Sequence, residues 1–93
     1  ALRGTIDILD EQIIEKIASR MQISEKIGEY KKENNMTILQ LERWKKIIQD
    51  RSTLGKSTGL NQDFILEMLK LIHKESIRIQ TEVMSKKGDG VEF

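Results

Sequence analysis

The 93-residue chain contains no cysteine and no proline, and it has one histidine and four aromatic side chains (one Trp, one Tyr and two Phe). Without cysteine the chain can form neither a disulfide framework nor a thiolate metal site. A single histidine argues against a metal site built from imidazoles. No run of about 18 apolar residues is present, so the sequence predicts no membrane span. These absences predict a protein without a resident metal and without a membrane partner.

Charge of one sign is also scarce, because 16 Lys and Arg residues nearly balance 15 Asp and Glu residues, for a formal net charge of +1. Proteins that wrap nucleic acid usually carry a strong basic excess, so this balance argues against a nucleic-acid partner. The length allows one domain with a modest core. No charged segment followed by an apolar one opens the chain, so nothing indicates export. The first residue is Ala1 rather than Met, which suggests a processed or excised piece. We expect a cytoplasmic, all-helical domain.

The missing proline lets helices run long. From Leu2 to about Glu33, positions spaced by threes and fours form one straight stripe, because 29 steps of about 100° leave only ~20° of drift. Asn34-Asn35 predicts the end of this first helix, since Asn tolerates the left-handed conformation. The stripe consists of Leu2, Ile6, Leu9, Ile13, Ile17, Arg20, Ser24, Ile27 and Lys31.

Two shorter helices are expected to follow. The second covers about Leu39 to Ser52, and the Gly- and Ser-containing segment Thr53–Gly59 is the clearest loop. Asn61 or Gln62-Asp63 begins the third helix, which is expected to run to about Met84. Residues 1–85 are then the domain, and residues 86–93, with two glycines, are a flexible C-terminal tail.

Geometry predicts an intertwined homodimer. Thirty residues of helix are roughly 45 Å long, whereas a compact domain of this size has a radius of gyration of only ~12 Å. Two shorter helices cannot cover so long an apolar stripe, so a monomer would leave much of it in water. The alternative is a kink near Gly28 that folds the first helix back. Glycine alone does not force a kink, and the dimer is the favoured reading.

Polar residues interrupt the stripes where packing calls for apolar ones. Arg20 and Lys31 lie ~20° apart around the first helix and ~16 Å apart along it. On the third helix, Ser76 and Gln80 share an inward face. On the second helix, one face is shared by Gln40, Arg43, Trp44 and Ile47. Cations buried without partners are costly, and no carboxylate occupies these stripes. The pattern therefore predicts a helix-lined pocket for a small ligand with one or two carboxylates or phosphates.

Other candidate features have plainer interpretations. His73 lacks a nucleophile or carboxylate partner and is interpreted as an ordinary helix residue, and Trp44 as a packing residue. The sequence contains no Gly-rich phosphate loop, metal-ligand spacing or Ser/His/Asp arrangement, so it predicts no cofactor.

The order and spacing of several short motifs resemble the all-helical (AroQ) class of chorismate mutases, or chorismate mutase type II, over about Leu2 to Met84. That class has a long first helix and two shorter ones, entwined as a homodimer. Arg43 follows Lys31 at the spacing the family uses. The other motifs are Leu2-Arg3 with Ile6 and Leu9-Asp10 (LRxxIxxLD), Ile17-Ala18-Ser19-Arg20 ((L/I)xxR), Ile27-Gly28-Glu29-Tyr30-Lys31 ((V/I)GxxK) and Glu75-Ser76-Ile77-Arg78-Ile79-Gln80.

The resemblance implies an isomerase that converts chorismate, a small dicarboxylate, to prephenate by a Claisen rearrangement without a cofactor. It implies that Arg20 clamps a carboxylate and that Ser76 lies near the ring carboxylate. Lys31 would contact a carboxylate and the ether oxygen, and Gln80 would donate to that oxygen. The remaining implied substrate-binding residues are Arg43, Gln40 and, from the other subunit, Arg3. Arg3 lies about 100° around the helix from Arg20 and is therefore poorly placed for its own chain's site.

Gln40 and Trp44 depart from the acidic residues usual in the family, positions that help hold the substrate's ring hydroxyl. Two other functions stay open at this point. One is isochorismate pyruvate lyase activity on the same scaffold, and the other is a non-catalytic dimerisation or regulatory module of a larger enzyme. In related bifunctional proteins the domain is fused to the synthase that opens the shikimate pathway, so a fused or associated synthase is a further expected partner.

Overall fold

The computed structural model describes residues 1–89, with side chains through Lys86, and within them the chain forms three α-helices and no strand. Helix α1 spans Leu2–Glu33, α2 spans Leu41–Ser57 and α3 spans Gln62–Asp89. The predicted all-α class is confirmed. No helix in the described part combines the length and apolar character that crossing a bilayer requires. Residues 90–93 of the predicted tail lie outside the described residues.

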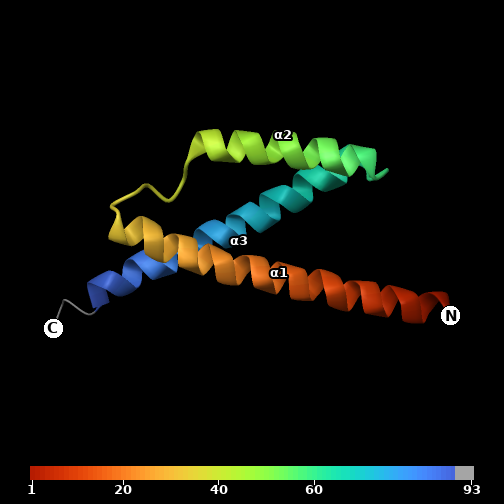
Figure 1. Ribbon diagram of the computed structural model, residues 1–93, viewed down its shortest axis with the longest axis horizontal. Coiled ribbons are helices and arrows are strands. Elements are labelled where there is room, and N and C mark those ends of the chain that lie inside the picture. Colours follow the sequence, from red (N-terminus) through yellow and green to blue (C-terminus); the bar gives the residue numbers. More distant parts are fainter. Residues whose placement is uncertain (90–93) are drawn as a thin grey trace.

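Helix α3 connects the other two helices, which diverge from each other. It packs on α1 and on α2, whereas α1 and α2 make no direct helix-to-helix contact within the described residues. Figure 1 shows α3 crossing from the C-terminal half of α1 to the far end of α2. The small apolar core lies where α2 meets α3. It consists of Ile47, Ile65 and Leu69, with Trp44 and Ile48 packed against them.

The helix ends follow the predicted local chemistry in three places. The side chain of Asn34 donates to the backbone oxygen of Tyr30 at 2.8 Å, and Asn35 adopts φ 53°, the left-handed conformation expected after α1. The Oδ1 atom of Asn61 accepts a hydrogen bond from the N–H of Phe64 at 3.0 Å, which is an N-cap for α3.

Helix α1 continues through Gly28. The alternative in which a kink folds α1 back is therefore wrong.

The segment expected to be the loop between the second and third helices is mostly helical, so that prediction was wrong. Helix α2 begins at Leu41 rather than about Leu39 and continues to Ser57, five residues past the expected end. Gly55 is buried inside α2, where its missing side chain admits Ile65 of α3. Glycine serves close packing here and does not break the helix. Gly59, at φ +85°, lies in the short turn that follows. Helix α3 likewise runs to Asp89, beyond the expected end near Met84.

Adding a methyl group at Gly55 should therefore destabilise the fold. A Cβ atom there would overlap Cδ1 of Ile65 and lie 2.9 Å from its Cγ1, and Ile65 is only 1% exposed. Overpacking of this kind costs about 1–3 kcal/mol, so urea unfolding of Gly55→Ala should show a loss of that size. Gly4→Ala is the matched control, because nothing lies within 4 Å of a Cβ at that helical position. Equal stability of the two variants would contradict this packing argument.

The N-terminal half of α1 extends away from the rest of the chain with its apolar stripe uncovered. Leu2 is 87% exposed, and Ile6 and Ile13 are each more than half exposed. The only buried residues of α1 are Ser24 and Gly28, both in its C-terminal half. The molecule measures 57 × 30 × 16 Å and has a radius of gyration of 16.5 Å, above the ~12 Å of a compact domain of this length. As the sequence predicted, a single chain leaves much of the stripe in water.

Candidate active site

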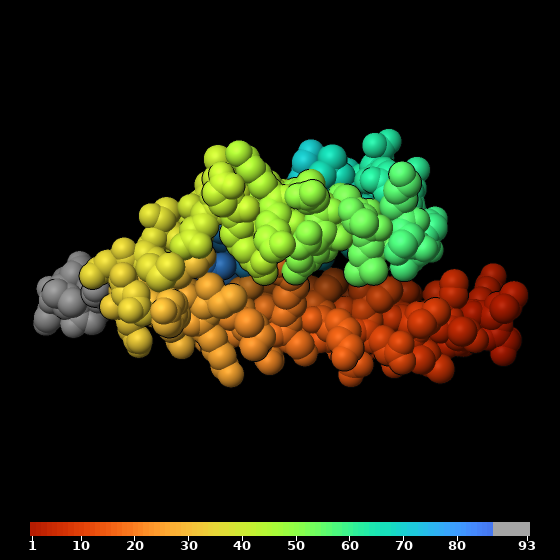
Figure 2. Space-filling view, turned by 45° about the horizontal axis from the view of Figure 1, so that its top comes forward, coloured from red at the N-terminus to blue at the C-terminus, as the bar shows by residue number. Residues whose placement is uncertain are grey.

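A pocket of about 350 Å³ lies between the C-terminal half of α1 and α2, with α3 as its floor. Figure 2 shows this hollow between α1 (orange) and α2 (yellow-green), with α3 (blue) visible at its base. Its volume falls within the range of small-molecule sites. The lining residues are Arg20, Ile23, Ser24, Ile27, Lys31, Ile38, Gln40, Arg43, Trp44, Ile47, Arg51, His73, Ser76, Ile77 and Gln80.

A chain of hydrogen bonds joins α1 to α3 along the floor of the pocket. The Lys31 ammonium donates to the backbone oxygen of Ile38 at 2.6 Å and to Gln80 Oε1 at 2.9 Å. Gln80 Nε2 donates to Ser76 Oγ at 3.1 Å, and Ser76 and Ser24 share a hydrogen bond of 2.7 Å between their hydroxyls. Because Lys31 has only donors, it fixes the carbonyl end of Gln80 toward itself and the amide N–H₂ end toward Ser76.

The close approach of α1 to α3 at this point depends on Gly28. A Cβ atom on Gly28 would lie 3.1 Å from the Cα of Gln80 and 3.3 Å from its Cγ. Gly28 is therefore the position where α1 lets the backbone of α3 come near enough for Lys31 to reach Gln80. Ser24, Ser76 and Gln80 are all buried. Within residues 1–86, no buried side-chain nitrogen or oxygen lacks a hydrogen-bond partner.

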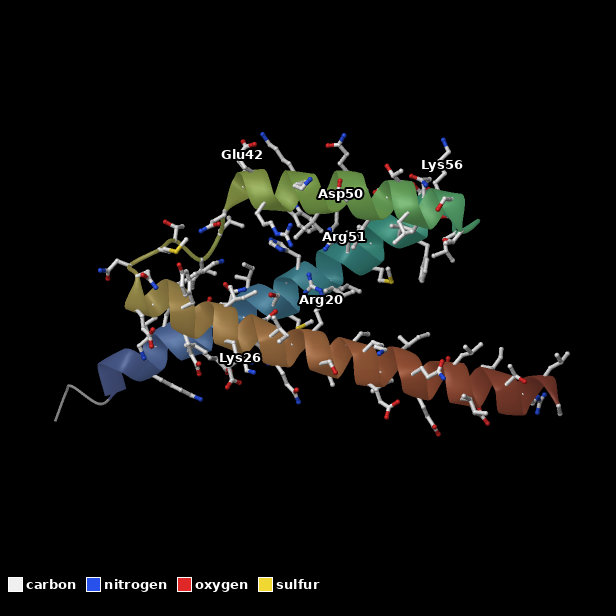
Figure 3. All side chains as sticks on the ribbon, viewed as in Figure 1. Arg20, Lys26, Glu42, Asp50, Arg51 and Lys56 are labelled. Carbon is white, nitrogen blue, oxygen red and sulfur yellow. The ribbon has the colours of Figure 1, made fainter. Side chains whose placement is uncertain are left out.

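Three guanidinium groups line the pocket, and no Asp or Glu is among its lining residues. Arg20 comes from α1, and Arg43 and Arg51 come from α2. Figure 3 shows Arg20 and Arg51 in the space between α1 and α2. Burial, and then the nearby charges of Arg51 and Arg43, lower the pKa of Arg20, which nevertheless stays protonated.

Neither the surroundings of Lys31 nor Glu75 of α3 supplies a counter-charge to the pocket. Burial lowers the pKa of Lys31, which shows that the pocket disfavours an uncompensated ammonium. Glu75, next to Ser76 in sequence, does not supply the missing negative charge, because both of its oxygens accept hydrogen bonds from Arg78 at 2.7 Å. The pocket therefore presents excess positive charge to a ligand.

Trp44 and His73 form one wall of the pocket as a stacked pair, with ring centroids 4.0 Å apart and planes inclined by 20°. Burial, followed by the charges of Arg20 and Lys31, lowers the pKa of His73. Its imidazole is therefore neutral at pH 7. The sequence interpretation of Trp44 as a packing residue is confirmed by its contact with the core cluster. His73, interpreted as an ordinary helix residue, lies on the pocket wall instead.

The structure brings six of the seven predicted site residues to this pocket and leaves one outside. The exception is Arg3, which lies at the exposed start of α1 and does not line the pocket. Seventeen residues of helix separate it from Arg20, or ~25 Å. Sequence reasoning missed Arg51. A signal was available, because Arg51 follows Trp44 by seven residues and therefore lies ~20° from it around α2. The six that meet are Arg20, Lys31, Gln40, Arg43, Ser76 and Gln80.

The chemistry available in the pocket is binding and electrostatic stabilisation of an anion. Within the described residues no cluster of three or more His, Asp or Glu side chains could hold a metal ion. The two serine hydroxyls are hydrogen-bonded to each other, without a histidine or carboxylate to activate either. Fixed cations and amide donors around a small cavity define a helical protein that holds a compact polyanion and stabilises charge developing on it.

Comparison with known proteins identifies the class. Residues 2–81 match the chorismate mutase type II family. Because this match covers most of the chain, the protein belongs to that family of all-helical isomerases.

Several curated relatives are longer proteins that contain a similar segment. The chain is 34% identical over 84 residues to a bifunctional chorismate mutase/prephenate dehydratase of Buchnera aphidicola from Acyrthosiphon pisum, covering 90% of this chain and 22% of that protein. Its counterpart in Escherichia coli K12 is 26% identical over 86 residues, or 92% of this chain and 22% of the relative. The T-protein of Haemophilus influenzae is 29% identical over 75 residues, which cover 81% of this chain and 20% of that protein. The chain thus spans about a fifth of the length of these relatives.

Proposed function

We propose that the protein is a chorismate mutase, which converts chorismate to prephenate by a Claisen rearrangement. The observation that carries this proposal is the pocket itself. It combines a carboxylate-binding end, built from guanidinium groups, with Lys31 and Gln80 as paired donors at the other end. The substrate is a dicarboxylate with an ether oxygen whose bond breaks in the reaction. The family match and the names of the relatives support the same activity.

The first task of the site is to hold the substrate in a reactive shape. The rearrangement requires the enolpyruvyl arm to lie over the ring, and two fixed carboxylates favour that conformation over extended ones. Arg20 clamps one carboxylate, and Arg43 lines the same end from α2. Ser76 lies near the ring carboxylate on the floor. A preorganised clamp of this kind lowers the barrier by removing conformational freedom before the reaction begins.

The second task is to stabilise the negative charge that grows on the ether oxygen as its bond breaks. The Lys31 ammonium has three N–H donors, of which two are used by Ile38 and Gln80, so a third is free for substrate. Gln80 likewise uses one amide N–H on Ser76 and keeps the second. Both donors are already oriented before substrate binds. Fixed donors of this kind stabilise a transition state more than a ground state.

Recognition of the ring hydroxyl must use neutral groups in this protein. Gln40 lies at the N-terminus of α2 and lines the pocket, with its Nε2 3.4 Å from the backbone oxygen of Thr37. This leaves its Oε1 free to accept a hydrogen bond. Trp44 supplies an aromatic ring and an indole N–H donor there, but no acceptor. Neither residue removes the carboxylate clamp or the donors to the ether oxygen, so catalysis survives these two departures from the family pattern.

We also propose that the active protein is an intertwined homodimer in which Arg3 of each chain completes the partner's site. The support is the uncovered stripe on the first half of α1 and the exposed position of Arg3 at its start. A second copy of α1 packed on that stripe would cover it and bring the partner's Arg3 toward the pocket of this chain.

Two substrates separate the proposed activity from the lyase alternative on the same scaffold. The purified chain is incubated separately with chorismate and isochorismate, and the products are identified. We expect prephenate from chorismate and little reaction with isochorismate. Pyruvate formed mainly from isochorismate would instead assign the pocket to a pyruvate lyase. Inactivity with both substrates would favour a non-catalytic module.

Two finer assignments belong to the same proposal. We propose a cytoplasmic location for the enzyme, which fractionation of cells expressing the native gene would test. For a fused partner, the named relatives combine chorismate mutase with prephenate dehydratase, whereas the sequence resemblance suggested a shikimate-pathway synthase. The synthase stays a prediction, which the sequence of the complete gene would test.

A further inference from the structure

The pocket holds more positive charge than the proposed substrate can neutralise. Four side chains that carry a permanent charge line it, and no Asp or Glu is among the lining residues. A dicarboxylate supplies two negative charges, so two of these four cations would be left without a counter-charge. Arg51 is the one that no sequence motif assigned. Its position on the pocket wall therefore requires its own explanation.

Arg51 has no structural partner that would account for its position. No carboxylate lies within 4.0 Å of it among residues 1–86, although other cations of α2 do have such partners, such as Lys46 with Asp50 at 3.3 Å. Arg51 is half-buried, and its charge acts on Arg20 across the pocket. Like charges repel one another across the pocket when no anion lies between them. An arrangement that costs free energy when empty and gains it with an anion is a feature of a binding site.

We propose that Arg51 is a further specificity-determining residue, which forms with Arg20 and Arg43 a three-guanidinium subsite for one carboxylate of the substrate. Arg20 would approach the carboxylate from α1 and Arg51 from α2, the positions that Figure 3 shows for these two residues, and Arg43 also lines the pocket from α2. Guanidinium groups bind carboxylates through paired N–H donors, so three of them can saturate both oxygens. This inference rests on the proposed function for the identity of the substrate, but not for the existence of the anion subsite.

Within this subsite, Arg20 lies 11 residues, or ~16 Å along α1, from Lys31, which serves the ether oxygen together with Gln80. Loss of Arg51 should therefore weaken substrate binding much more than the chemical step. We expect Arg51→Gln to raise KM for chorismate about tenfold or more and to change kcat by less than about threefold, because one charge-assisted contact is lost. Arg51→Lys keeps the charge and loses the paired geometry, so its KM should lie between the KM of the parent and that of Arg51→Gln.

Thermal unfolding supplies a readout that a purely structural role would not produce. The empty Arg51→Gln variant should be at least as stable as the parent, because the substitution removes a like charge. Stabilisation by citrate, used as an unreactive tricarboxylate probe and compared with sodium chloride at equal ionic strength, should be smaller than in the parent. Lys45→Gln is the control, because it removes the same charge from an exposed position on α2. It should leave both KM and citrate stabilisation unchanged.

The outcomes separate this inference from the proposed function. If Arg51→Gln keeps KM within twofold of the parent and citrate stabilises both equally, the subsite is refuted. If the unfolding temperature and kcat of Arg51→Gln both fall, Arg51 has a structural role, and the subsite is refuted in that case too. If the parent does not convert chorismate, the proposed function fails. A selective loss of citrate stabilisation in Arg51→Gln would still support the subsite in that case.

Discussion

Replacement of Lys31 or Gln80 by alanine is expected to lower kcat for chorismate by two to three orders of magnitude. Each substitution removes one donor aimed at the position of the ether oxygen, and loss of one such donor costs about 3–4 kcal/mol of transition-state stabilisation. The two residues are also joined by their own 2.9 Å hydrogen bond. Removal of either one frees the other to turn away from the substrate. Steady-state kinetics of both single variants and the double variant would measure the effect.

The coupling between the two residues makes a sharper test than either single loss. Because they act as one unit, the double variant should be only slightly slower than the slower single variant. Lys32→Ala is the matched control for the lysine, since Lys32 is the next residue of α1 and does not line the pocket. It should retain the parent rate. Unchanged turnover in Lys31→Ala or Gln80→Ala would refute the assigned roles.

Mixing two inactive variants should restore activity if the site is shared between subunits. Arg3→Ala and Arg20→Ala each damage both sites of their own homodimer. In a hybrid dimer, one site receives both alanines and the other keeps both arginines. After subunit exchange under mild denaturant, random pairing makes about half of the dimers hybrids, and each hybrid has one intact site of two. The mixture should therefore recover roughly a quarter of the parent activity.

The controls for this experiment test the dimer itself. Light scattering should give about twice the chain mass for the parent and for both variants, since Arg3 lies off the apolar stripe and Arg20 lines the pocket rather than the uncovered N-terminal half of that stripe. Mixing two samples of the same variant should restore nothing. A complete failure of the mixed variants to recover activity, with subunit exchange verified, would contradict a shared site. A monomeric parent would remove the basis of the dimer proposal.

Much of the fold was predictable from the sequence because local rules act strongly in a chain without proline. The periodicity of the apolar residues predicted a first helix from Leu2 to about Glu33, and Asn34-Asn35 predicted its end, in agreement with α1. Asn61, one of the two predicted starts of the third helix, caps α3. The local rules failed at Gly55, because its role depends on Ile65, which packs against it from another helix. A local reading takes glycine as a breaker, whereas tertiary packing uses it as a space. The end of α2 was misplaced for this reason.

The site was predictable where a polar residue interrupts an apolar stripe, and it was not predictable elsewhere. Lys31, Ser76 and Gln80 occupy inward positions, so their pattern alone pointed to a polar pocket. Arg51 shares the side of α2 that carries Trp44, and His73 lies three residues before Ser76 on α3, but one charged or polar residue at such a position is ordinary in a helix. Only the divergence of α1 and α2, which leaves an open space above α3, makes these residues pocket walls. That divergence depends on contacts between helices and has no local sequence signal.

The most direct test of the central claim is the product that the purified 93-residue chain forms from chorismate in the presence of a metal chelator. Placed cations and amide donors, without covalent or metal assistance, predict that chorismate disappears and an equal amount of prephenate appears, and that the chelator does not change the rate. The Lys31→Ala variant should lose nearly all of this activity under the same conditions. Consumption of chorismate no faster than the uncatalysed reaction, or without matching prephenate, would contradict the account.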